Sequence, residues 1–197
     1  MSALVTLLVI IDPPGCAPIF ASLTSSATPA HRRSQAVRSV FIAACILIGF
    51  GAFGQPFLKT LGISLDAFRI AGGIMLFLIA IDMVFEKRTQ RREERAQSVQ
   101  EQDDVSVFPM AMPMLAGPGS IASIMLLTSQ AKTGMSLFAV YLALAIVLAL
   151  TLAALLLAGP IMERVSPKIE TVITRLLGVI LAALAAQIVI DGLNNAF

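Results

Sequence analysis

Hydrophobic positions along the chain gather into six long stretches, separated by short polar segments. The hydrocarbon core of a bilayer is about 30 Å thick, so a helix that spans it needs about 20 consecutive apolar residues. Each stretch comes close to that length. The sequence therefore predicts an all-α membrane protein with six transmembrane helices, at residues 3–23, 39–58, 68–85, 107–127, 135–159 and 171–193.

Composition supports lipid as the solvent of this chain. Hydrophobic residues make up 57% and charged residues 13% of the sequence, whereas soluble domains average about 45–50% and about 25%. The net charge of +2 is too small to indicate a nucleic-acid partner. The partners that we expect are the bilayer, a small solute and a second copy of the chain in a homo-oligomer.

The positive charges predict the orientation. Eleven of the 14 Lys and Arg residues, counting Arg175 near the start of the sixth helix, lie in or beside the connections after the first, third and fifth helices. Connections rich in these residues stay in the cytoplasm. We therefore expect residues 87–106 to be a charged cytoplasmic loop. Both termini are then expected on the outer side of the membrane, which is the periplasmic side if the chain comes from a Gram-negative bacterium.

Two halves of the chain repeat one another. Arg69 and Gly72 of the third helix match Arg175 and Gly178 of the sixth at an offset of 106 residues. The Pro-Gly pairs of the first and fourth helices match at an offset of 104. Each half, 1–86 and 107–197, has three spans, so the second must enter the membrane from the opposite side. This pattern predicts a 3+3 inverted repeat, an architecture of many secondary transporters.

Proline and glycine interrupt two of the expected helices, at Asp12-Pro13-Pro14-Gly15 in the first and Gly117-Pro118-Gly119 in the fourth. A proline has no N–H to donate within the helix, and a freed carbonyl cannot face lipid. We predict that both helices are broken at Pro-Gly. Simple proline kinks are the alternative interpretation.

A broken helix can bind a charged solute in mid-membrane. The N-terminus of its second segment carries N–H groups and partial positive charge, which suit a carboxylate, and the carbonyls of its first segment suit a cation. A zwitterion meets both requirements. The predicted binding residues are Asp12, Pro13, Pro14, Gly15, Cys16, Gly117, Pro118, Gly119 and Ser120.

Asp12 has two interpretations. A carboxylate at membrane depth costs free energy, so its presence there indicates a function or a structural role. It either couples transport to a proton or sodium ion, or caps the half-helix that follows it, and capping does not exclude coupling. Asp82 and Gln187 are further candidates for ion coupling or for support of the site. Gln187 is also suited to a hydrogen bond between helices.

Enzymatic signals are weak. His31 is the single histidine, so a zinc site built from several histidines is excluded. Gly49, Gly51 and Gly54 have the dinucleotide-binding spacing, but they lie in a membrane span and not after a strand. We expect no enzyme activity, no catalytic residue, no metal and no cofactor.

Two sequence runs resemble the MarC family of membrane proteins: Pro113–Gly119, and Asp12-Pro13-Pro14-Gly15 followed by Pro18-Ile19-Phe20. The similarity covers nearly the whole chain. The resemblance implies a bacterial inner-membrane protein related to transporters of neutral amino acids such as alanine, glycine or serine. This chain has Cys16 where the family often has asparagine.

The function that we expect is secondary transport of small neutral amino acids or similar zwitterions by alternating access. Two alternatives remain open at this point. One is a membrane assembly or stress-response factor that transports nothing, and the other is a passive channel for small solutes.

Overall fold

The computed structural model describes residues 3–85, 104–158 and 167–196. These residues are helical apart from short turns and contain no strand, which confirms the predicted all-helical class. The elements are α1 (Ala3–Ile11), α2 (Pro13–Leu23), α3 (Pro29–Thr60), α4 (Leu65–Val84), η1 (Ser106–Leu115), α6 (Pro118–Gln130), α7 (Gly134–Leu156) and α9 (Pro167–Ala196).

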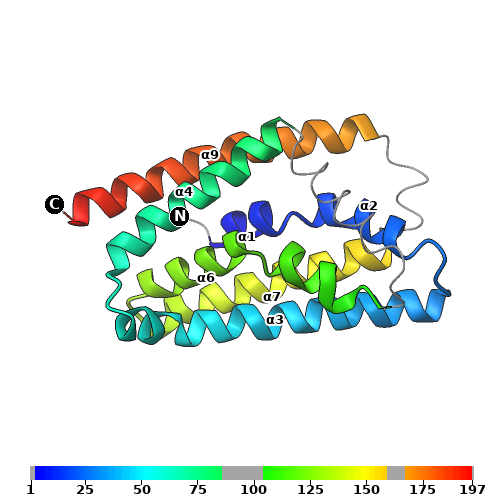
Figure 1. The fold of residues 1–197 in the computed structure, drawn as a ribbon, viewed down its shortest axis with the longest axis horizontal. Helices are drawn as coiled ribbons and strands as arrows, with labels where there is room; N and C mark the ends of the chain where they lie inside the picture. The colour runs from blue at the N-terminus through cyan, green and yellow to red at the C-terminus, as the bar shows by residue number, and fades with distance from the viewer. Residues whose placement is uncertain (1–2, 86–103, 159–166, 197) are drawn as a thin grey trace.

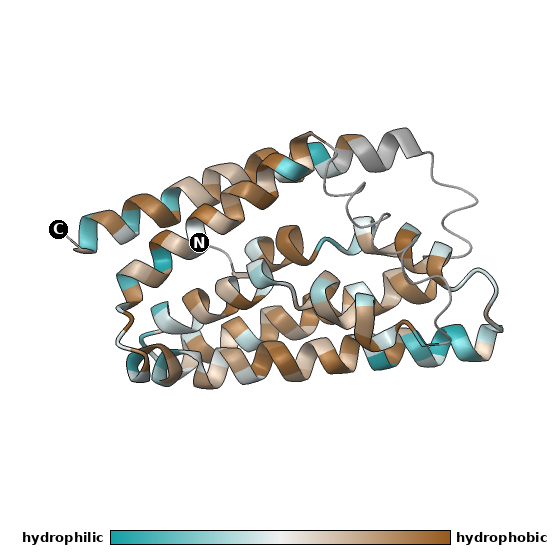
Figure 2. Cartoon of the chain, viewed as in Figure 1, coloured by the Kyte–Doolittle hydropathy of each residue, from teal (hydrophilic) through white to brown (hydrophobic). Residues whose placement is uncertain are grey.

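The lengths of these elements fit a multi-pass membrane protein. Five helices, with α1 and α2 together counted as one, are long and apolar enough to cross a bilayer. The pair formed by η1 and α6, bent by 54°, gives a sixth span if it is counted as one. Hydrophilic residues gather at the ends of the helices and hydrophobic residues along their middles (Figure 2), as lipid around the helix walls requires.

α3 begins ten residues before the apolar stretch that predicted it. The Thr28 side chain accepts a hydrogen bond from the His31 N–H at 3.3 Å and caps the helix. Arg32, Arg33 and Arg38 therefore belong to the first turns of α3, and not to a loop. Hydropathy locates only the part of a helix that lies in lipid, whereas this helix continues beyond it. Residues 87–103 of the expected loop 87–106 lie outside the described residues.

Helices from each half of the chain pack on helices from the other half. α4 packs along α9, whereas α1 and α2 pack on α7 from the other half, and η1 and α6 pack on α3. Figure 1 shows α4 and α9 side by side along one edge of the molecule, and α3 and α7 along the opposite edge. The segments α1, α2, η1 and α6 lie between these two pairs.

α4 and α9 run antiparallel and approach closely. A Cβ atom at Gly73 of α4 would lie 3.0 Å from the Ala185 carbonyl oxygen, and one at Gly192 of α9 would lie 3.2 Å from the Asp66 carbonyl oxygen. Small residues allow such backbone contact between membrane helices.

Buried apolar side chains form two clusters. The larger joins α1, α2, α3, η1, α6 and α7, around residues such as Phe20, Leu47 and Leu144. The smaller lies where the α4–α9 pair meets the broken helices, and includes Ile10, Leu76 and Leu126. The interrupted segments are therefore packed from both sides by hydrophobic side chains.

Candidate functional site

The first helix is broken at Asp12. α1 ends at Ile11 and α2 begins at Pro13, while Asp12 has left-handed backbone angles of φ 57° and ψ 65°. Aspartate is among the few residues that enter this region without a large penalty. Its side chain is only 1% exposed, and Oδ1 accepts a hydrogen bond from the Gly15 N–H at 3.2 Å. Asp12 therefore caps α2, as one of its two interpretations required.

This cap leaves the N-terminus of α2 without a spare donor. Pro13 and Pro14 occupy its first two positions and have no N–H, and the third N–H, from Gly15, is bonded to Asp12. The carbonyl of Val9 loses the donor that a continuous helix would give it, because the residue four positions later is Pro13. The N-terminus of α2 therefore has no N–H group for an anion, whereas the Val9 carbonyl and the Asp12 carboxylate carry negative charge at this break.

Cys16 helps to close the backbone at this break. Its thiol donates to the Ile11 carbonyl at 3.4 Å, and its N–H donates to the Asp12 carbonyl at 3.1 Å. The Ile11 carbonyl would bond the Gly15 N–H in a continuous helix, but that donor turns to the Asp12 side chain. A fully buried thiol takes its place.

The second break lies between η1 and α6, at Ala116 and Gly117. η1 is irregular, with extended backbone at Phe108 and Met112, and the chain bends by 54° before α6. Pro118 takes the first position of α6, and no side chain in the described part of the chain caps this helix. The N–H groups at its second and third positions, from Gly119 and Ser120, have no partner within the helix. The second break therefore offers donors.

The fold brings the two breaks together. A Cβ atom at Gly119 would lie 3.6 Å from Ile10 Cγ2 at the end of α1. The same atom would lie 3.4 Å from Leu76 Cδ2 and 2.5 Å from Ile79 Cδ1, both on α4. The start of α6 thus packs against the side chain of Ile10 near the end of α1, beneath side chains of α4. Glycine at position 119 is what allows this approach.

Two other predicted residues belong to the α4–α9 pair. Asp82 is half-buried in the last turn of α4. Gln187 is exposed on α9, and its Nε2 donates to Asp191 Oδ1 at 2.7 Å, one turn along its own helix. No group of three or more histidine, cysteine, aspartate or glutamate side chains suited to a metal occurs among the described residues.

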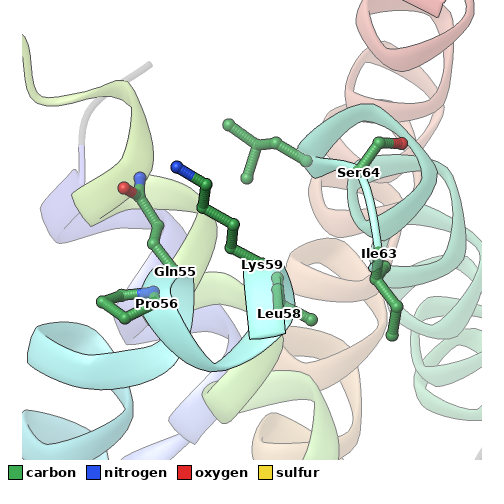
Figure 3. A pocket seen from close by; sticks show the side chains of 7 residues that line it. Gln55, Pro56, Leu58, Lys59, Ile63 and Ser64 are labelled. Atoms are coloured by element: carbon green, nitrogen blue, oxygen red, sulfur yellow. The ribbon is translucent and has the colours of Figure 1, made fainter. Parts of the chain in front are cut away.

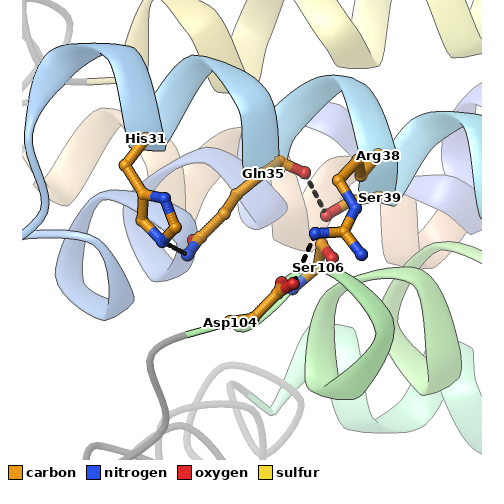
Figure 4. Close-up of polar contacts among 6 residues, drawn as sticks. All are labelled: His31, Gln35, Arg38, Ser39, Asp104 and Ser106. Atoms are coloured by element: carbon orange, nitrogen blue, oxygen red, sulfur yellow. Dashed lines mark hydrogen bonds and ion pairs between the residues drawn. The ribbon is translucent and has the colours of Figure 1, made fainter.

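A polar cluster that the sequence analysis missed joins the start of α3 to the start of η1 (Figure 4). Arg38 pairs with Asp104 at 2.6 Å, and the Ser106 N–H donates to Asp104 Oδ1 at 2.9 Å. Hydrogen bonds from Ser106, and then the nearby Arg38 guanidinium, hold the pKa of the Asp104 carboxyl below its usual range. Arg38 and Asp104 are 66 residues apart, so no local pattern indicated the pair.

Comparisons with known proteins place the whole chain in one group. The sequence model of the MarC family of integral membrane proteins matches residues 1–197. A UPF0056 membrane protein of Methanocaldococcus jannaschii is 40% identical, over 95% of this chain and 92% of its own. The UPF0056 inner membrane protein YhgN of Escherichia coli is 33% identical, over 98% of this chain and 95% of its own. No solved structure matches the chain.

Proposed function

The chain belongs to the MarC family of integral membrane proteins, and on this premise we propose that it is a secondary transporter of small neutral amino acids or similar zwitterions. One observation carries the proposal. The two breaks differ in polarity, because α2 has no N–H to offer whereas α6 has an uncapped N-terminus. The two breaks are neighbours, because the Ile10 side chain at the end of α1 packs beside Gly119 at the start of α6.

A zwitterion has one charged group for each of the two breaks. In the proposed complex, the N–H groups of Gly119 and Ser120 donate to the carboxylate of the solute, with support from the partial positive charge of the helix end. The Val9 carbonyl and the Asp12 carboxylate face the ammonium group. The solute is small because Leu76 and Ile79 lie directly over Gly119, so bound solute must displace them.

The packing of helices from one half on helices from the other half supports a 3+3 inverted repeat. α1 and α2 use α7 in the way that η1 and α6 use α3, and α4 pairs antiparallel with α9. An inverted repeat gives inward-open and outward-open states of similar energy, as alternating access requires. In this mechanism the α4–α9 pair moves against the broken helices, across the apolar cluster that includes Ile10, Leu76 and Leu126.

Orientation and coupling complete the proposal. The Lys and Arg bias puts both termini outside, and the E. coli relative is named an inner membrane protein, so we place this chain in the cytoplasmic membrane. A proton or sodium gradient drives transport in this scheme. Asp12 is the first candidate for coupling because its carboxylate is buried beside the solute, and Asp82 and Gln187 are retained as further candidates.

Flux measurements test the function directly. The purified protein is reconstituted in liposomes, and uptake of labelled alanine, glycine, serine, leucine and glutamate is measured with and without proton and sodium gradients. We expect saturable uptake of the small neutral amino acids that a gradient accelerates. Uptake that never saturates and ignores both gradients would indicate a channel, and no uptake of any amino acid would favour a membrane factor that transports nothing.

A further inference from the structure

The end of the bundle that carries the α3–α4 turn has a polar hollow of about 360 Å³. Its lining side chains come from three helices: Arg69 from α4, Gln130 from α6, and Asp191, Asn194 and Asn195 from α9. All five are polar or charged. We call this hollow the vestibule.

Both signs of charge face the vestibule. The Arg69 guanidinium reaches Asp66 through NH1 at 2.8 Å, and its buried Nε has no hydrogen-bond partner within the described chain. Asp191 accepts one hydrogen bond from Gln187 through Oδ1. A solute that carries one carboxylate and one ammonium group therefore has a donor and an acceptor of the right charge here.

A second, smaller hollow shares the lining residue Gln130 with the vestibule. This inner hollow is also lined by Thr6, Ser123 and apolar side chains that include Leu126 and Ile188. Its volume of about 10 Å³ is near the lower limit for one water molecule. The path is therefore narrow in this structure.

Ser123 is the unusual member of the inner hollow. Its hydroxyl is 1% exposed and has no hydrogen-bond partner in the part of the chain that the structure describes. A buried hydroxyl without a partner costs free energy. Ser123 also lies four residues after Gly119 on α6, so both are on one face of the helix, one turn apart. The lining of the hollow thus comes within one helical turn of Gly119 at the uncapped end of α6.

We propose that the vestibule is a peripheral binding site for the transported zwitterion, from which the solute passes Gln130 and Ser123 to reach Gly119. Arg69 receives the carboxylate and Asp191 the ammonium group. Leu126 and Ile188 close the path in this state. The inference rests on the proposed transport function, which it extends by a second site.

A zwitterionic lipid headgroup has the same chemistry, since phosphatidylethanolamine carries an ammonium group and an anion. The experiment therefore uses two kinds of liposome, one of phosphatidylglycerol alone, which has no zwitterionic headgroup, and one with phosphatidylethanolamine added. Initial rates of labelled alanine uptake are measured across a range of alanine concentrations for Arg69→Gln and Asp191→Asn.

In liposomes without phosphatidylethanolamine, we expect each substitution to raise the half-saturation concentration about tenfold, the effect of losing one charged hydrogen bond. The maximal rate should stay within about twofold, because the central site is intact. Arg69→Lys should restore part of the affinity. Asn194→Leu fills the vestibule without removing a charge, and it should raise the half-saturation concentration as Arg69→Gln does. Agreement between these two different substitutions would show that the effect does not come from misfolding of one variant.

The matched control is Lys59→Gln. Lys59 lies at the same end of the bundle but lines a different depression, with Gln55 and Ser64, at the α3–α4 turn (Figure 3). Removing its charge should leave both kinetic constants unchanged.

Three results overturn the inference. Unchanged half-saturation in the vestibule variants, with normal uptake by the parent protein, rejects the vestibule and leaves the transport proposal intact. An effect that appears only with phosphatidylethanolamine assigns the vestibule to a lipid headgroup. Absence of any alanine uptake by the parent rejects transport itself, and the vestibule with it.

Discussion

The carboxylate of Asp12 lies directly over the α-carbon of Gly15, so that a methyl group at residue 15 would collide with Asp12 Oδ2 and lie 2.9 Å from the carboxyl carbon. One residue caps the half-helix, and the other leaves room for the cap. The break in the first helix depends on this pair. Substitutions at Asp12 and Gly15 can therefore separate the structural role of the break from its role in transport.

Gly15→Ala should destabilise the protein, because the new methyl group expels the Asp12 side chain from its cap. Loss of an N-cap costs about 0.5–2 kcal/mol. The measurement is thermal unfolding in detergent. Gly49→Ala is the matched control, because a Cβ atom there meets nothing within 4 Å, and alanine stabilises a helix relative to glycine. Equal unfolding temperatures for the two variants would contradict the cap.

Asp12→Asn and Asp12→Ala should separate capping from charge. Asparagine keeps a side-chain oxygen for the Gly15 N–H, so Asp12→Asn should unfold near the wild-type temperature. Asp12→Ala should lose about 1 kcal/mol of stability. If the carboxylate serves the ammonium group or a coupling ion, both variants lose uptake of alanine in liposomes. Wild-type uptake by Asp12→Asn would leave Asp12 with the capping role alone.

Gly119→Ala should slow transport because its Cβ atom collides with Ile79 Cδ1. The larger Gly119→Val should abolish alanine uptake while folded protein is still recovered. Ile79→Ala removes the colliding atom, so the double variant Gly119→Ala with Ile79→Ala should recover part of the lost rate. Additive losses in the double variant would show that the two residues do not interact, and Gly49→Val serves as the control for added volume.

The Arg38–Asp104 pair should give a small stabilisation that disappears in acid. Because the folded pKa of Asp104 is lowered, its contribution is present above the unfolded value of about 3.9 and is lost as the pH falls through the lower folded value. Both side chains are more than a third exposed, so the pair contributes at most about 1 kcal/mol.

A double-mutant cycle of Arg38→Gln and Asp104→Asn measures this coupling, by chemical unfolding at pH 7 and pH 3. The coupling energy should be positive at pH 7 and smaller at pH 3, because the pH then approaches the lowered pKa of Asp104. A coupling that is unchanged at pH 3 would assign the effect to neutral hydrogen bonds, such as those with Ser106.

The sequence determined whatever depends on local composition. Apolar length identified the membrane spans, and prolines that lack an N–H marked the neighbourhoods of Asp12 and Gly117, because these properties hold wherever the segment lies in the fold. Boundaries were less well predicted where a helix continues past the bilayer, as α3 does through Arg32 and Arg33. The cap at Thr28 sets that boundary, and hydropathy does not register it.

Only the tertiary structure decided what the broken ends can bind. The pairs Pro14-Gly15 and Pro118-Gly119 look equivalent in the sequence. In the structure, the Asp12 side chain caps the helix at the first pair, whereas no side chain of the described residues caps the helix at the second. The meeting of Gly119 with Ile10 and Ile79 joins residues that are distant in the chain, as does the pairing of Arg38 with Asp104. Such contacts depend on how whole helices pack, and packing between distant segments leaves no periodic or local mark in the order of the amino acids.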